Sequence, residues 1–211
     1  MNISKIFEII ALLTSLVAFK AIRPLYLRIL VPLLILTVAV ENYFSKIIEV
    51  NTVYNVFSLV EMAVWFFIFF KILPRKNFRV GIAIAAILCF TYAFVEVMYL
   101  RSWLVFRTDS LRIYNLSIIL FSTLYFFEIN KKEYHNIFTD PLFWICTACF
   151  LFHLLFFFNN TIWGQFFYWK LTNAKAVYIT LQSTANIIYY SLLCKGLLVC
   201  YYKFKLEQLN L

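Results

Sequence analysis

Ionisable and amide side chains are scarce in this chain, and several of them lie inside long apolar stretches. A charged group at the centre of a hydrocarbon layer costs roughly 2.5–3.5 kcal/mol on insertion scales, so such groups usually face the interior of a helix bundle. Carboxylate and amide groups there can hydrogen-bond a polar molecule. We therefore predict an internal cavity, open to the outer side, that binds a small ligand through these residues: Glu41, Asn55, Glu61, Asn115, His153, Gln182 and Asn186.

Glu61 is the acid that we expect to lie deepest. Its apolar stretch begins at Val53, and Glu61 lies about 12 Å further along that stretch at a rise of 1.5 Å per helical residue. We predict that Glu61 anchors the ligand or accepts a proton. The alternative is a structural role, in which Glu61 hydrogen-bonds Asn115, Gln182 or Asn186 and holds helices together. Three other acids are expected at hydrated helix ends: Glu8, Glu49 and Glu96.

The last apolar stretch carries a polar stripe. Gln182, Asn186 and Tyr189 follow the i, i+4, i+7 spacing that places side chains on one face of a helix. We expect this stripe to face the bundle interior, opposite Glu61, if the third and seventh stretches are neighbours.

Seven apolar stretches must position these residues. The chain has 211 residues, of which 64% are hydrophobic and 14% charged, whereas a soluble domain carries about 25% charged residues. A membrane-spanning helix needs about 20 apolar residues, and helices satisfy every backbone group in lipid. We therefore predict one all-α domain, 1–211, folded as a polytopic seven-transmembrane-helix bundle. Its predicted spans are 6–19, 25–44, 53–73, 80–100, 113–129, 141–158 and 177–201.

The net charge of +9 is interpreted as a topology signal rather than as a nucleic-acid-binding surface. Twelve Lys and Arg residues fall in the connections after the first, third and fifth stretches and in the C-terminal segment, against seven on the other side. Basic residues are enriched on the cytoplasmic side of membrane proteins. We therefore expect the N-terminus outside and the C-terminus inside.

Several familiar sites are not favoured by the sequence. His153 is one of two histidines in the chain, whereas a zinc site of this kind needs three. Cys146 and Cys149 lie inside an apolar stretch, where packing explains them better than redox chemistry. Lys195 lacks the Asp four residues earlier that retinal proteins show, because Ser191 stands there. We predict no metal, no cofactor and no disulfide.

Three segments carry a resemblance: VYNVFSLVEMAVWFF from Val53, DPLFWICTACFLF from Asp140 and ANIIYYSLL from Ala185. They resemble segments of small, uncharacterised seven-span bacterial membrane proteins. The resemblance implies a stand-alone protein of the bacterial inner membrane and implies no activity. The seven-helix plan with its N-terminus outside is also similar to semi-SWEET-related sugar transporters, although their Pro-Gln pair is missing here.

Three classes of function remain open, and an enzyme is not favoured. The first is a small-ligand sensor or accessory subunit, which would pass a signal to a membrane partner or to a second copy of itself. The second is a small proton- or cation-coupled transporter that uses Glu61. The third is an oligomeric, pore-forming effector of the membrane. The predicted partners are the lipid bilayer, a small ligand, and either a signalling membrane protein or a second copy of this chain. Nucleic acid is not a predicted partner.

Overall fold

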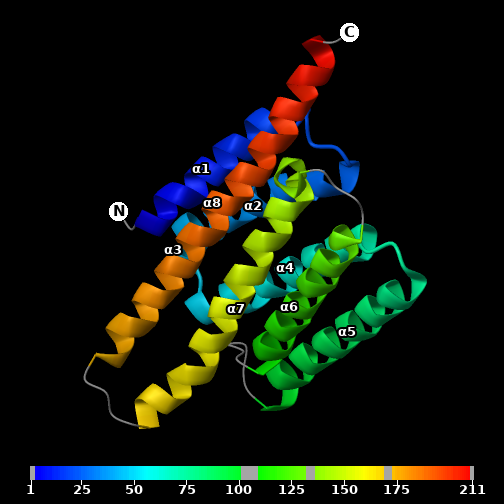
Figure 1. The fold of residues 1–211 in the computed structure, drawn as a ribbon. Helices are drawn as coiled ribbons and strands as arrows, with labels where there is room; N and C mark the ends of the chain where they lie inside the picture. Colours follow the sequence, from blue (N-terminus) through cyan, green and yellow to red (C-terminus); the bar gives the residue numbers. More distant parts are fainter. Residues whose placement is uncertain (1–2, 101–108, 132–135, 169–172, 210–211) are drawn as a thin grey trace.

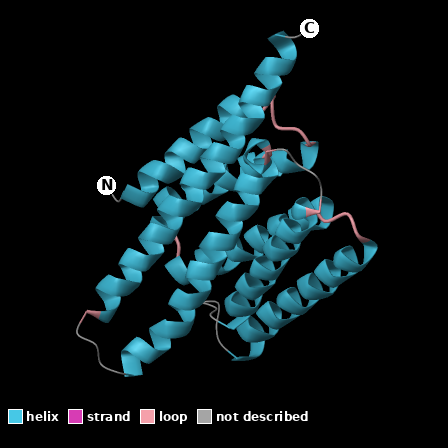
Figure 2. Cartoon of the chain, in the orientation of Figure 1, coloured by secondary structure: helices cyan, strands magenta, loops and turns pink. Residues whose placement is uncertain are grey.

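The computed structural model describes residues 3–100, 109–131, 136–168 and 173–209. Within these residues every regular element is helical, and none is a strand (Figure 2). The predicted all-α fold is therefore confirmed. The helical framework is labelled in Figure 1 and consists of α1 (Ile3–Ala18), α2 (Leu30–Ala39), α3 (Ser45–Ile47), α4 (Val50–Ile72), α5 (Lys76–Val95), α6 (Asp109–Asn130), α7 (Pro141–Tyr168) and α8 (Ala174–Leu209).

Four short elements extend these helices or precede them. A 3₁₀ turn, η1 (Leu25–Ile29), leads into α2, and a second one, η4 (Ile137–Thr139), leads into α7. Two π-helical turns, η2 (Val40–Phe44) and η3 (Glu96–Leu100), continue α2 and α5. Because η1, α2 and η2 run on without a break, they form one continuous span over 25–44.

Six helices are long and apolar enough to cross a membrane, among the residues described: Leu25–Phe44, Val50–Ile72, Lys76–Tyr99, Asp109–Asn130, Pro141–Thr161 and Ala176–Leu209. They correspond to the second to seventh predicted spans. The first predicted span, 6–19, is α1, which has 16 residues and is about 24 Å long. That length falls short of the roughly 30 Å of a bilayer's hydrocarbon core. Six of the seven predicted spans thus coincide with helices that could cross a membrane.

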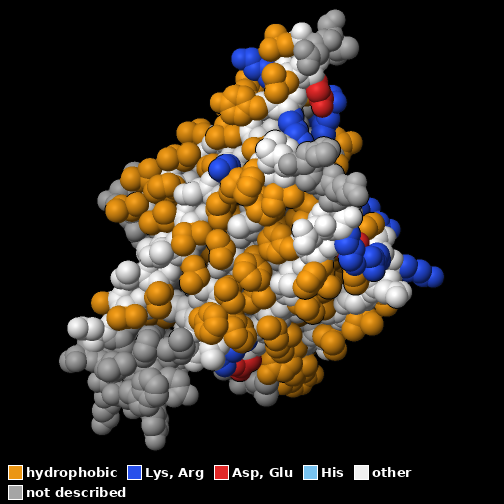
Figure 3. Space-filling view, viewed as in Figure 1, with side chains coloured by type: hydrophobic (Ala, Val, Ile, Leu, Met, Phe, Trp, Pro, Cys, Tyr) orange, Lys and Arg blue, Asp and Glu red, His pale blue; other side chains and the backbone are white. Residues whose placement is uncertain are grey.

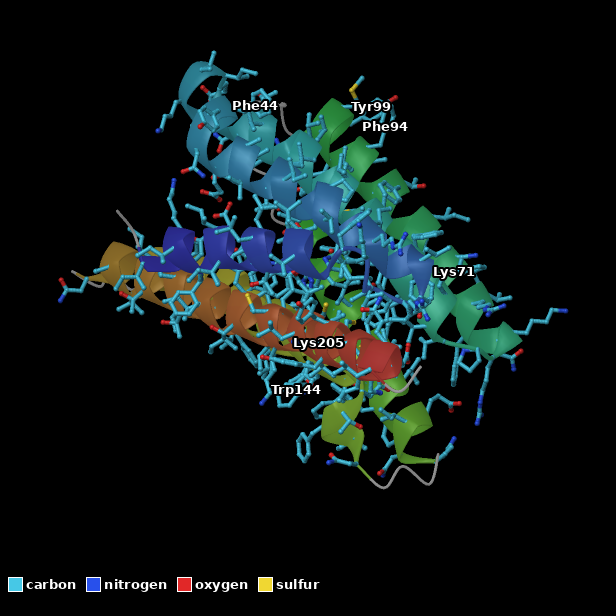
Figure 4. The ribbon with its side chains drawn as sticks, turned by 90° about the horizontal axis from the view of Figure 1, so that it is seen from above. Phe44, Lys71, Phe94, Tyr99, Trp144 and Lys205 are labelled. Atoms are coloured by element: carbon cyan, nitrogen blue, oxygen red, sulfur yellow. The ribbon has the colours of Figure 1, made fainter. Side chains whose placement is uncertain are left out.

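The outer surface of the bundle is apolar. Figure 3 shows hydrophobic side chains over most of the visible face, with Lys and Arg gathered toward the end that holds the C-terminus. Phe44, Phe94 and Tyr99 lie on this outer surface (Figure 4), 43%, 58% and 78% exposed. A soluble monomer rarely exposes so large an apolar area. Contact with a lipid bilayer accounts for it.

Six helices form a closed ring. α8 packs along α7 and α1, α1 packs against α2, α2 against α4, α4 against α6, and α6 against α7. α5 stands outside this ring against α4 and α6, at the edge of the bundle in Figure 1. The ring therefore brings the two ends of the sequence, α1 and α8, side by side.

Aromatic rings fill the seam between α4 and α6. The Phe66 ring meets those of Tyr114 and Phe121 edge-on, with centroids 5.9 Å and 6.1 Å away. The centroid of Phe69 is also 6.1 Å from that of Phe121. Edge-to-face pairs of this kind add about 0.5–1.5 kcal/mol beyond the area that they bury. They hold one side of the ring together.

The α7–α8 contact depends on a glycine. A Cβ atom built on Gly196 would lie 2.9 Å from Cγ1 of Ile145 and 3.1 Å from the carbonyl oxygen of Pro141. The second neighbour is backbone and cannot turn aside. Small residues permit such close approach of helices in membranes. Gly81 on α5 is different, because a Cβ there would meet nothing within 4 Å.

We predict that Gly196→Ala destabilises the bundle, by about 1–3 kcal/mol as overpacked sites do. Gly81→Ala is the matched control and should be neutral or stabilising, because alanine is the better helix former. Thermal unfolding midpoints of the two variants in the same detergent make the comparison. Equal midpoints would show that α7 and α8 do not approach this closely.

Candidate functional site

A cavity of about 400 Å³ lies inside the ring. This volume falls within the roughly 300–1,000 Å³ of small-molecule sites. Every helix of the ring contributes to its wall. The polar lining residues are Ser4, Lys5, Glu8, Thr37, Glu41, Tyr54, Ser58, Glu61, Gln182, Ser183 and Asn186. The others are Leu30, Leu33, Leu34, Phe57, Leu111, Phe152, Phe156, Ile179, Tyr189, Tyr190 and Leu193.

Four of the seven predicted site residues come together on this wall. They are Glu41 on η2, Glu61 on α4, and Gln182 and Asn186 on α8. The polar stripe of α8 thus faces the bundle interior, as its spacing predicts. α4 and α8 line the same cavity, but α8 packs along α7 and α1. The space between α4 and α8 is what leaves room for a ligand.

Glu8 also belongs to the cavity wall. The sequence prediction of a hydrated helix end is wrong for it, because only 3% of Glu8 is exposed. The buried residues of α1 explain its position, since they repeat every three or four residues: Ser4, Glu8, Ala11, Ser15 and Ala18. This stripe of small and polar residues lets α1 pack closely against α8. The stripe is visible in the sequence and is the signal that identifies Glu8.

Glu41 is held by neighbouring side chains. Lys5 Nζ donates to the Glu41 carbonyl oxygen at 3.0 Å and lies 4.0 Å from Oε2 of the same residue. The Tyr54 hydroxyl is a hydrogen-bond partner of the Glu41 carboxylate. The π-helical turn η2 carries Glu41, and such turns occur often at functional sites. Lys5 and Tyr54 are two lining residues that the sequence analysis did not single out.

Glu96 has a structural role. It is fully buried rather than hydrated, so the sequence prediction is wrong here too. Its carboxylate accepts backbone N–H bonds from Ser110 at 2.9 Å and Asp109 at 3.3 Å. The first N–H groups of a helix lack partners inside the helix. Glu96, at the start of η3, supplies acceptors for these N–H groups and fixes the start of α6.

The other three predicted site residues lie outside the cavity wall. His153 Nδ1 and Asn115 Oδ1 are 2.7 Å apart and join α7 to α6. An amide oxygen only accepts, so His153 donates. Both side chains are buried, as is Asn55 on α4. His153 thus forms the interhelical hydrogen bond that is common for a lone histidine in a span.

Cys146, Cys149 and Lys195 also lie away from the cavity. Both cysteines are buried free thiols on α7, at most 1% exposed. The Lys195 ammonium lies 3.8 Å from the centroid of the Trp144 ring, a cation–π contact at the surface of the bundle.

We predict that Asn115→Ala lowers the stability of the protein and leaves the residues that line the cavity unchanged. The substitution leaves buried His153 Nδ1 without a partner, which costs about 1–3 kcal/mol. Thr123→Ala on the same helix is the control, because its hydroxyl bonds only the Ile119 carbonyl one turn back. Thermal unfolding in detergent should show a lower midpoint for Asn115→Ala alone. Equal midpoints would mean that the His153 pair does not hold α6 to α7.

Comparison with known proteins supplies no family for this chain. No protein-family model matches it, no curated protein matches it, and no solved structure matches it. The chemistry and position of the cavity are therefore the basis on which a function can be inferred.

Proposed function

We propose that the protein is a membrane-embedded ligand-binding protein that acts as a sensor or accessory subunit. The observation that carries this proposal is the closed helical ring around a cavity of ligand size. The polar groups of the cavity come from helices far apart in the sequence. A ligand that touches α1, α4 and α8 together would favour one arrangement of the ring over others, which is what a binding signal requires.

The signal would leave through another protein, and α8 is suited to carry it. This helix has 36 residues, about 54 Å, and projects beyond the other helices at its C-terminal end (Figure 1). Gln182 and Asn186 lie on its cavity part, and Lys203 and Lys205 lie near its far end. A membrane partner, or a second copy of the chain, would contact this projecting end.

The distribution of charge supports a cavity that opens to the outer side of the membrane. Lys5 and Glu41 mark one end of the ring, where α1 begins and the second span ends. The opposite end carries the α4–α5 turn, in which the basic residues Lys71, Arg75 and Lys76 follow one another closely. Under the positive-inside rule this basic end faces the cytoplasm. The N-terminus is then outside and the C-terminus inside.

A small proton- or cation-coupled transporter is the second candidate. The observation that favours it is the position of Glu61, on the cavity wall near the middle of α4. Intramembrane acids are common in proton relays. The pore-forming effector has less support, because the polar stripe of α8 faces the cavity of a single chain and needs no assembly to be shielded from lipid.

Permeability of sealed liposomes that hold the purified protein tests the proposal. A proton-sensitive dye and a small fluorophore are entrapped together. A sensor or accessory subunit should leave both signals unchanged. Proton flux without fluorophore loss, abolished in Glu61→Gln, would replace the proposal with the transporter. Loss of both dyes would replace it with the pore.

Glu128→Gln is the matched control for that substitution. Glu128 pairs with Arg75 at 3.1 Å and Lys131 at 3.3 Å, outside the cavity. Loss of its charge should not alter proton flux in any of the three cases. A change in flux with Glu128→Gln as large as that with Glu61→Gln would show a general charge effect rather than a site.

A further inference from the structure

We propose that the cavity binds a small organic cation with an apolar body, whose ammonium group lies between Glu8 and Glu61. This inference rests on the proposed function, because it assumes that the cavity is a ligand site. It adds the chemical class of the ligand.

The cavity holds an excess of acidic groups. Its ionisable carboxyl groups belong to Glu8, Glu41 and Glu61, and Lys5 is its one basic residue among the parts of the chain described. Lys5 is engaged with Glu41, through the carbonyl bond at 3.0 Å and the ion pair at 4.0 Å. The wall thus holds three carboxyl groups against one ammonium group.

Glu8 has an unsatisfied acceptor that points to a ligand. Its Oε1 atom is buried and has no hydrogen-bond partner among the described residues. A buried polar atom without a partner costs about 1–3 kcal/mol. An ammonium group in the cavity would donate to this oxygen, and a hydrogen bond between two charged groups is about twice as strong as a neutral one. An anionic ligand would be repelled there.

Aromatic rings provide a second feature that suits a cation. The Phe152 centroid lies 5.4 Å from that of Phe156 in a stacked arrangement and 4.8 Å from that of Tyr189. These rings, together with Phe57 and Tyr190, line the cavity from α4, α7 and α8. The negative face of an aromatic ring attracts an organic cation by about 0.5–2 kcal/mol.

Leucines from α2 and α8 define the apolar part of the ligand. Leu30, Leu33, Leu34 and Leu193 line the cavity together. Divalent metal ions such as Ca²⁺ take six to eight oxygen ligands, several of them carboxylates, and no three His, Cys, Asp or Glu side chains of the described residues lie close enough together to hold a metal ion. A primary amine on a hydrocarbon or aryl body matches both the acids and the leucines.

Calorimetric titration of the protein in lipid nanodiscs tests the inference. The probes are phenylalkylamines with two to six methylenes, each compared with the phenylalkanol and the phenylalkanoate of the same length. Titrations into empty nanodiscs correct for partition into lipid. We expect at least one amine to bind at least tenfold more tightly than its matched alcohol, and the carboxylates to bind most weakly.

Variants assign the charge preference to the two acids. Glu8→Gln and Glu61→Gln should each reduce amine affinity at least tenfold and leave alcohol affinity within twofold. Glu128→Gln, which removes an acid outside the cavity, should leave amine affinity unchanged. The two cavity variants are independent, and unfolding midpoints show whether each is folded.

Two results would overturn the inference, and they affect the proposed function differently. If amines and alcohols bind with equal affinity and Ser183→Trp, which fills the cavity, abolishes both, the cavity binds ligands without regard to charge. The proposed function then stands and the cation does not. If no amine binds, the inference also fails, and the liposome measurement decides separately between a sensor, a transporter and a pore.

Discussion

The free-energy cost of exposing a charge or an amide to hydrocarbon is the constraint on which this structure depends. Buried polar groups of the bundle meet that constraint in two ways. Some are paired within the protein, as His153 is with Asn115 and as Glu96 is with the backbone of α6. Other polar groups, Glu8 and Glu61 among them, face a cavity. Their position is what turns a helix bundle into a candidate binding protein.

Helix packing then decides which polar groups share the cavity. The small buried residues Ala11, Ser15 and Ala18 permit close packing of α1, which contacts α8 and so closes the ring between the two ends of the chain. α1 is too short to be counted among the six candidate spans, yet it supplies Lys5 and Glu8 to the wall. A ligand bound in the cavity would therefore contact a helix that is shorter than the six candidate spans.

The sequence predicts single helices well and their partners poorly. Apolar length identified six spans, and the spacing of Gln182 and Asn186 identified the interior face of α8, because both signals are local. The long-range partner of Asn115 was not predictable, since periodicity does not say which helices are neighbours. Some helix ends were also predicted wrongly. α7 runs to Tyr168, well past the predicted end at 158, and α8 begins at Ala174, before the predicted start at 177. Glu8 was predicted to be hydrated because it lies near the start of the first predicted span, 6–19.

Cysteine reactivity tests most directly that a water-accessible, acidic cavity lies inside the ring. The five native cysteines are buried, so the wild-type protein serves as the blank. Cells that produce Ser183→Cys are treated from outside with a cationic or an anionic methanethiosulfonate of similar size, and Ser122→Cys, at a buried site on α6, is the comparison. The structure predicts that Ser183→Cys is modified, faster by the cationic reagent, while Ser122→Cys is not. If neither variant is modified, the result contradicts a water-accessible cavity at Ser183.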